Sequence, residues 1–300
     1  MVAKQTFRQA IQNSARQKTL GLQERLYTEG ATSTIYNNTA LKKLKKNYLM
    51  KKILRWALRI LLAFIGLLIV LFIGVWIASD SYPKGEQGPA AEALAQKMAQ
   101  ATHKAAWDSV GAVCWNFANR QQHLWDKKRH LAKVQWKTYE VLVDINKKTG
   151  IAFKNGARVA EKDNTTLVEK AWKFWVNDSF WLNAPAKIFD PGTSRSFVKM
   201  EDGSDALLVQ YSSGGATPGD AYLWLLDKNG RPKAWRLWVK IVPLKGLEFS
   251  WENWLRVNEG ASISRTHASK LFTLELKDIK TAPSAAALNG GSDPFAALFE

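Results

Sequence analysis

The chain has 300 residues, of which 46% are hydrophobic, and this is enough for one domain with a sizeable core. Its formal net charge is +17, but residues 1–59 contribute 13 basic and two acidic side chains, which leaves 30 basic against 24 acidic in the remaining 241 residues. A nucleic-acid-binding protein carries its basic excess on the folded module, so this distribution argues against nucleic acid as a partner. The single cysteine, Cys114, excludes an intramolecular disulfide, and we expect it to be a small core residue.

Residues 53–79 are predicted to form a membrane anchor. The run Ile60–Ala78 contains 19 residues without a charge, and at about 1.5 Å per residue it spans about 28 Å, close to the hydrocarbon thickness of a bilayer. Many Lys and Arg residues crowd its N-terminal flank, whereas Asp80 and Lys84 follow it. The positive-inside rule therefore predicts a single-pass protein whose residues 1–52 form a basic cytoplasmic segment and whose folded domain lies on the other side.

The anchor is expected to stay uncleaved. Its apolar run is longer than the core of a signal peptide, and the positions where a cleavage site needs a small residue hold Trp76 or Ile77. The stretch Met50-Lys-Lys-Ile-Leu-Arg is nevertheless typical of the start of an exported protein, which gives the hypothesis that translation begins at Met50 and that residues 1–49 are not part of the natural protein. The alternative is a partly helical cytoplasmic arm that is attracted to anionic headgroups.

Beyond the anchor, the sequence predicts a linker, a domain and a tail. Residues 80–89 are rich in proline and glycine and read as a linker, with Pro89 in the first turn of a helix. Residues 90–280 are predicted to be the extracytoplasmic domain. Residues 281–300, rich in Ala, Ser, Gly and Asn, are expected to be a disordered tail.

The domain is predicted to be α+β. Apolar residues alternate with polar ones over long stretches after Gly111, which indicates strands, and the dipeptides Asp202-Gly203 and Asn229-Gly230 are strong hairpin signals. A second helix is predicted to begin at Asn164 or Thr165. About 10 or 11 short strands in one large curved antiparallel sheet, with two or more packed helices, account for the pattern.

Twelve of the fourteen tryptophans follow residue 100, and they are the candidate ligand-binding residues. Trp235 and Trp238 are three residues apart, as are Trp251 and Trp254, and on a strand this spacing puts the two side chains on opposite faces. One face of the sheet then packs on helices, while the other face is covered or holds an apolar ligand. A second interpretation is that the tryptophans stack on sugars. For each single tryptophan the alternative is a place in an aromatic core. The cavity candidates are Trp115, Trp136, Trp175, Trp181, Trp224, Trp238 and Trp254.

No motif predicts a metal, a cofactor or catalysis. The histidines and Asp126 match no familiar metal-ligand spacing. The sequence also contains no nucleophile elbow, P-loop, dinucleotide fingerprint or zinc-protease motif. We therefore expect a non-enzyme, with an unrecognised hydrolase as the alternative.

Loop motifs together with the element order suggest a family. The motifs are Asn177-Asp178-Ser-Phe-Trp181-Leu at the end of the second helix, Phe189-Asp190-Pro-Gly, and Thr217-Pro-Gly-Asp220-Ala-Tyr-Leu-Trp224. With them, residues 90–280 resemble the LolA/LolB-like superfamily of periplasmic lipoprotein carriers, whose incomplete antiparallel barrel and helices enclose an apolar cavity for acyl chains. The resemblance implies an incomplete barrel, a periplasmic domain on an inner (plasma) membrane anchor, and a lipid or lipoprotein ligand. Family carriers are soluble or lipid-anchored through a cysteine, so the helical anchor favours a stationary domain over a shuttle.

Two functions remain open at this point. The first is a membrane-tethered periplasmic binding module for an apolar ligand: an acyl chain, a lipid or a lipoprotein. The second is a structural or interaction protein of the cell envelope, with no small ligand, whose loops or tail recruit a protein partner. A dry cavity lined by several tryptophans distinguishes the first from the second.

Overall fold

The computed structural model describes residues 2–213 and 218–300, except for some side chains before residue 45. The chain divides into two compact units, residues 1–74 and 75–300. Helix α1 (Val2–Ala78) is continuous, so the arm before the anchor is more helical than the sequence predicts. Its part Lys45–Ala78 is long and apolar enough to cross a membrane, and none of its most apolar window is buried by the rest of the protein. This is the only such helix among the described residues.

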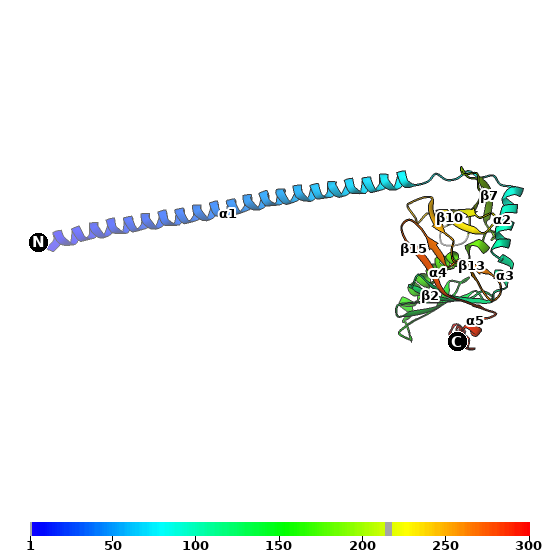
Figure 1. Cartoon of the computed structure of the whole chain (residues 1–300). Helices are drawn as coiled ribbons and strands as arrows, with labels where there is room; N and C mark the ends of the chain where they lie inside the picture. Colours follow the sequence, from blue (N-terminus) through cyan, green and yellow to red (C-terminus); the bar gives the residue numbers. More distant parts are fainter. Residues whose placement is uncertain (1, 214–217) are drawn as a thin grey trace. The chain divides into compact units, whose positions relative to one another are not determined.

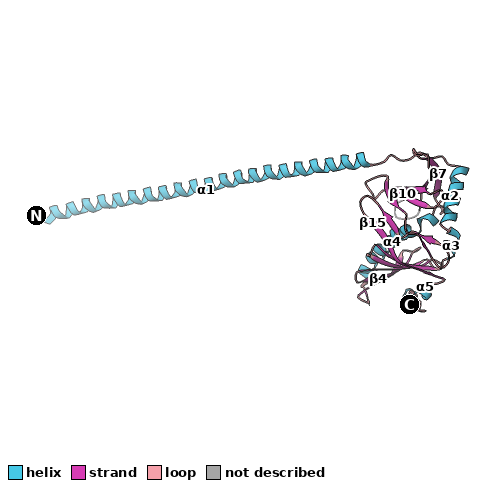
Figure 2. Cartoon of the chain, viewed as in Figure 1, coloured by secondary structure: helices cyan, strands magenta, loops and turns pink. Residues whose placement is uncertain are grey.

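The domain is α+β, as predicted, and its larger sheet has eight antiparallel strands (Figure 2). The strand order is β14-β15-β1-β2-β3-β4-β5-β6. The alternation that predicted these strands is confirmed: Ala132, Val134 and Trp136 are buried on one face of β3, with Lys133 and Gln135 on the other. The bounds are β1 (Ala112–Phe117), β2 (Gln121–Asp126), β3 (Leu131–Trp136), β4 (Tyr139–Asp144), β5 (Thr149–Lys154), β6 (Ala157–Arg158), β14 (Thr266–Ala268) and β15 (Thr273–Ala282).

A second sheet corrects the expectation of one sheet with about ten or eleven strands. It has five strands in the order β11-β10-β9-β8-β7, and neither sheet closes into a barrel. The two sheets meet where Glu252 and Thr266 form an isolated bridge and the Ala268 backbone N–H donates to Ser250 Oγ over 3.0 Å. The bounds are β7 (Thr193–Lys199), β8 (Asp205–Tyr211), β9 (Asp220–Leu226), β10 (Pro232–Trp238) and β11 (Leu247–Ser250), with a separate pair β12 (Leu255–Arg256) and β13 (Ser262–Ile263).

Helix α4 (Glu161–Asn183) packs along β3, β4 and β5 of the eight-stranded sheet, and its last turns reach the core of the five-stranded sheet (Figure 1). Val168 and Ala171 lie in one buried cluster with the inner face of the eight-stranded sheet. Further along the helix, Phe180 and Trp181 pack on the core of the five-stranded sheet. Helix α2 (Pro89–Ala101) and the 3-10 turn η1 (Ala184–Ala186) complete this core, whereas α3 (Lys104–Ser109) adds Trp107 to the cluster beneath β1 and β15. Helix α4 therefore fills the space between the two inner faces.

The start of α4 differs from the prediction for a physical reason. Asn164, the expected N-cap, accepts from the Ala152 N–H over 2.8 Å and donates to the Gly150 carbonyl over 3.0 Å. Its side chain thus ties the helix to β5 instead of capping it, and the helix begins at Glu161.

The segment 80–86 is part of the domain, although the sequence predicts only a linker there. Glu86 and Phe197 exchange two backbone hydrogen bonds of 2.8 Å, which adds a bridge to the edge strand β7. The Tyr82 ring packs edge-on against Trp238. At Gly85 an added Cβ would collide with the side chains of Ser196 and Val198, so the chain lies against the outer face of the sheet only because this residue is glycine.

The expectation of a disordered tail over residues 281–300 is wrong. Strand β15 continues to Ala282, and the segment then forms α5 (Ala285–Leu288) and the 3-10 turn η2 (Ala296–Leu298). Phe295 is fully buried in a cluster with apolar residues on the outer face of the eight-stranded sheet. The Arg129 guanidinium donates two hydrogen bonds of 2.8 and 2.7 Å to the Asp293 carboxylate. One buried aromatic ring and a bidentate ion pair outweigh a composition that is typical of disorder.

Replacing Phe295 by alanine is expected to lower the free energy of unfolding by about 3 kcal/mol, because a fully buried ring is lost and a cavity remains. The measurement is urea unfolding of the full chain in nanodiscs, followed by tryptophan fluorescence. Phe299→Ala, at a position 69% exposed, is the matched control and should change the free energy by less than about 0.5 kcal/mol. Equal effects of the two variants would contradict the packing of the tail.

Candidate functional site

The seven candidate tryptophans lie in several separate parts of the core. Trp115, Trp136, Trp224 and Trp238 are each less than 10% exposed. Trp115 belongs to the cluster beneath β1 and β15, Trp136 to the one beneath α4, and Trp238 to the outer face of the five-stranded sheet. Trp224 packs within the core of the five-stranded sheet, and Trp254 lies at the margin of this core. Trp175 borders the cluster that contains Trp115. Trp181 lies between these two clusters and contacts both. The seven side chains therefore do not surround one common space.

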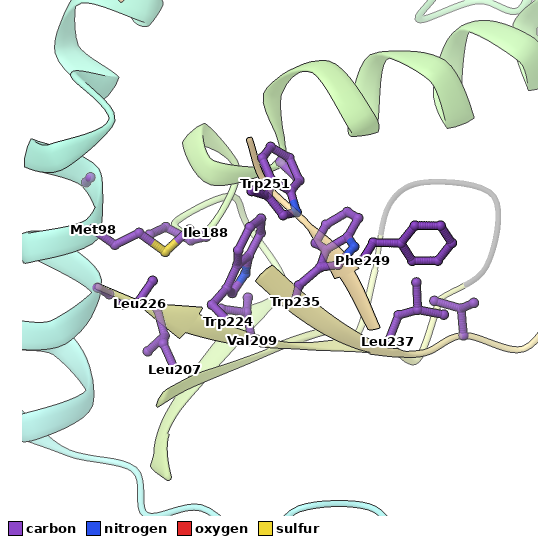
Figure 3. Close-up of a cluster of buried hydrophobic side chains, with 14 residues drawn as sticks. Met98, Ile188, Leu207, Val209, Trp224, Leu226, Trp235, Leu237, Phe249 and Trp251 are labelled. Atoms are coloured by element: carbon purple, nitrogen blue, oxygen red, sulfur yellow. The ribbon is translucent and has the colours of Figure 1, made fainter. Parts of the chain in front are cut away.

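The densest aromatic packing lies in the core of the five-stranded sheet. Trp224, Trp235 and Trp251 point toward one another, and Met98 and Ile188 close the group (Figure 3). The ring centroids are 4.9 Å apart for Trp224 and Trp235 and 4.9 Å apart for Trp235 and Trp251. These are contact distances for aromatic rings, so the group is filled by its own side chains.

An apolar pocket next to this core has little free volume. It is lined by Trp251, Trp254, Leu182 and Ile263, among others, and its volume is about 10 Å³. Ligand pockets in proteins typically have about 300–1,000 Å³. In this conformation the pocket has no room for an acyl chain.

Two histidines are buried in the aromatic core. His123 Nε2 lies 2.7 Å from Asp178 Oδ2, with Trp115 stacked on the imidazole ring at 4.4 Å. His267 is fully buried between Trp181 and Trp251. Burial lowers the pKa of His267 to about 4, with hydrogen bonds to backbone at Ser250 and Trp181 acting in the opposite direction. Among the described residues, no group of three or more His, Cys, Asp and Glu side chains could hold a metal ion.

A polar hollow lies on the outer face of the eight-stranded sheet. Asn116, Gln122, Gln135, Glu140 and Phe153 are direct cross-strand neighbours on β1 to β5, and they form one row across the sheet. Neighbouring strands are about 4.8 Å apart, so the row is about 19 Å long. The hollow has a volume of about 670 Å³, within the range of ligand pockets.

Three hairpin turns form the rim of this polar hollow. They contribute Asn119 and Arg120 between β1 and β2, Lys137 and Thr138 between β3 and β4, and Asn155 and Gly156 between β5 and β6. Asn119, Lys137 and Asn155 all have left-handed backbone conformations, with φ between 51° and 56°, as tight hairpins require. The Asn155 N–H donates to the Thr138 carbonyl over 2.9 Å, which joins two of the turns. The rim is therefore held in place by backbone geometry.

The floor of the hollow combines hydrogen-bond donors with acceptors. The Gln135 amide donates to Glu140 Oε2 over 2.7 Å, and Lys133 Nζ lies 4.0 Å from the same oxygen. Gln122 and Arg120 are exposed. The basic groups Arg120 and Lys137 are balanced only in part by Glu140, so the site has a small positive excess and no cluster of one charge.

The sequence did not reveal this row. Each strand shows a polar outward face, but the alignment of Asn116, Gln122, Gln135 and Glu140 depends on the register of three strand pairs. The sequence does contain one indication of the row: the outward-facing positions near the hairpin turns are polar.

No family model matches the sequence, and no curated protein matches it either. The LolA/LolB-like resemblance therefore stays a hypothesis.

Proposed function

We propose that this chain is a membrane-tethered binding domain and that the polar hollow holds its ligand, an extended hydroxyl-rich molecule of the oligosaccharide class. The observation that carries the proposal is the contrast between the two spaces: about 10 Å³ beside the tryptophans and about 670 Å³ over the polar row.

The side chains of the row suit hydroxyl groups. The amides of Asn116, Gln122 and Gln135 carry both donors and acceptors, and a hydroxyl group can be donor and acceptor at once. Part of this capacity is used within the protein, since Asn116 Oδ1 accepts from the Asn119 N–H and the Gln135 amide donates to Glu140. The Glu140 carboxylate adds an acceptor. Phe153 ends the row with an aromatic ring, which gives a sugar ring an apolar face to lie on. A phosphate ligand would instead favour clustered arginines and lysines.

An acyl-chain ligand, as the family resemblance implies, has less support. Its place would be the space between the sheets, which α4 fills with Phe180 and Trp181. Binding there would require α4 to leave the core. The filled core agrees better with the second function considered from the sequence, a stationary domain of the envelope that meets its partners at the surface.

The membrane tether is the second part of the proposal. The helix Lys45–Ala78 could cross a membrane. The excess of basic residues before it supports a cytoplasmic N-terminus and an extracytoplasmic domain. In the proposed arrangement the membrane is the inner (plasma) membrane and the domain is periplasmic.

The test is ligand binding by the full chain in nanodiscs, measured by calorimetry. The probes are neutral oligosaccharides with and without N-acetyl groups, inorganic phosphate, and a lysophospholipid. We expect binding of at least one oligosaccharide. The double variant Gln122→Ala/Gln135→Ala should weaken it about tenfold, since each lost hydrogen bond contributes about 0.5–1.5 kcal/mol.

The matched control is Gln96→Ala/Gln100→Ala, which removes two exposed glutamines from α2, outside the hollow. It should leave the affinity unchanged. Binding of the lysophospholipid alone, or equal losses in the two double variants, would overturn the proposal.

A further inference from the structure

The loop between β10 and β11 carries an exposed apolar tip. Ile241 is 71% exposed and Pro243 is exposed as well, whereas Val242 between them packs on the core of the five-stranded sheet. A single exposed apolar residue is ordinary on a protein surface. What distinguishes this one is where the loop is attached.

Both ends of the loop are bonded to the residues that directly follow α1. At its end, the Lys245 N–H donates to Ser79 Oγ over 3.2 Å and the Lys245 carbonyl accepts from the Asp80 N–H over 3.0 Å. At its beginning, Trp238 Nε1 donates to the Asp80 carbonyl over 3.2 Å. Ser79 and Asp80 are the first two residues after Ala78, the last residue of the apolar helix. The loop base therefore lies where the chain leaves α1.

The loop is closed on itself, so its tip is held in place. Lys245 Nζ donates to the carbonyls of Val239 and Val242 over 2.7 and 3.0 Å. The Lys240 N–H donates to Asp220 Oδ1 over 3.0 Å. Ile241 lies four positions before Lys245 in the sequence, and such a segment reaches at most about 14 Å.

Resting on the membrane tether proposed above, we propose that the exposed residues of this tip, Ile241 and Pro243, insert into the headgroup region of the membrane from which α1 emerges. The binding partner of the apolar tip is thus the lipid surface itself. The interfacial layer on each side of the hydrocarbon is about 5–8 Å thick, and the base of the loop lies within two residues of the end of the anchor.

The test uses the full chain with its single cysteine replaced, Cys114→Ala, and a new cysteine at the tip, Ile241→Cys, labelled with a polarity-sensitive fluorophore. The chain is placed in nanodiscs of phosphatidylcholine and phosphatidylglycerol. The matched control is Phe299→Cys, at a position of similar exposure, 69%, in the segment that packs on the other sheet. A third label, Leu71→Cys, reports on the anchor.

The tip label should emit at shorter wavelength than the Phe299→Cys label. It should be quenched severalfold more by lipids with a spin-labelled headgroup and less by iodide in solution. Equal iodide quenching at the two positions would overturn the proposal. Protection of the tip from iodide without quenching by lipid would also overturn it, since another protein surface would then cover the loop. Lipid quenching at Leu71→Cys but not at Ile241→Cys would leave the tether intact and reject only the loop contact.

Discussion

Replacing Asp178 with alanine is expected to lower the free energy of unfolding by about 3–5 kcal/mol, because it leaves the His123 imidazole buried without its carboxylate. The two side chains are 0% and 3% exposed, and their nitrogen and oxygen atoms are 2.7 Å apart. Asn177 donates to the other oxygen of Asp178 over 2.9 Å and would lose its acceptor as well. Urea unfolding of the full chain in nanodiscs measures the change, with the tryptophans as the probe.

Glu169→Ala is the matched control, because it removes a carboxylate from the same helix. Glu169 pairs with Lys173 over 2.6 Å, but the two side chains are 64% and 62% exposed. A surface pair of this kind contributes at most about 0.5 kcal/mol. The double variant His123→Leu/Asp178→Leu should cost less than Asp178→Ala, since it removes both polar groups together. A loss below about 1 kcal/mol for Asp178→Ala would contradict the role assigned to the pair.

The local pattern of the sequence was enough for the strands but not for their arrangement. Trp235 and Trp238 lie on opposite faces of β10, as their spacing predicts, because both are inside a strand. Trp251 and Trp254 instead pack in the same core, because β11 ends at Ser250 and the rule of alternation does not apply beyond it. Spacing predicts a face only where the strand bounds are known.

Tertiary contacts decided the features that the sequence missed. Composition made 80–89 a linker and 281–300 a disordered tail, but composition does not show that Gly85 allows close approach to β7 or that Phe295 has a place on the outer sheet face. The polar hollow is also a feature that tertiary contacts create and composition does not show. Its row exists only when Gln122, Gln135 and Glu140 are in register, and register is a property of strand pairs.

Acid is expected to destabilise the domain by about 3 kcal/mol between pH 7 and pH 4 through His267 alone. The pKa of this buried imidazole falls from 6.5 to about 4 in the folded state because burial disfavours the charged ring. Above pH 6.5 both states are neutral at this site and the effect is absent. Between pH 6.5 and about 4 the unfolded chain takes up the proton and the folded chain does not, so each pH unit lowers the free energy of unfolding by up to about 1.4 kcal/mol.

The measurement is urea unfolding of the full chain at several pH values, with His267→Gln and His130→Asn for comparison. His267→Gln should flatten the slope between pH 6.5 and 4, whatever its stability at pH 7, because the titrating group is gone. His130→Asn, at an exposed position, should keep the slope. The pKa values of Asp144 and Asp293 are lowered from the ordinary 3.8 of an aspartate by their hydrogen bonds, so these groups act at lower pH and do not mask this window. A slope that persists in His267→Gln would show that another group carries the acid sensitivity and that the imidazole is not held neutral by the aromatic core.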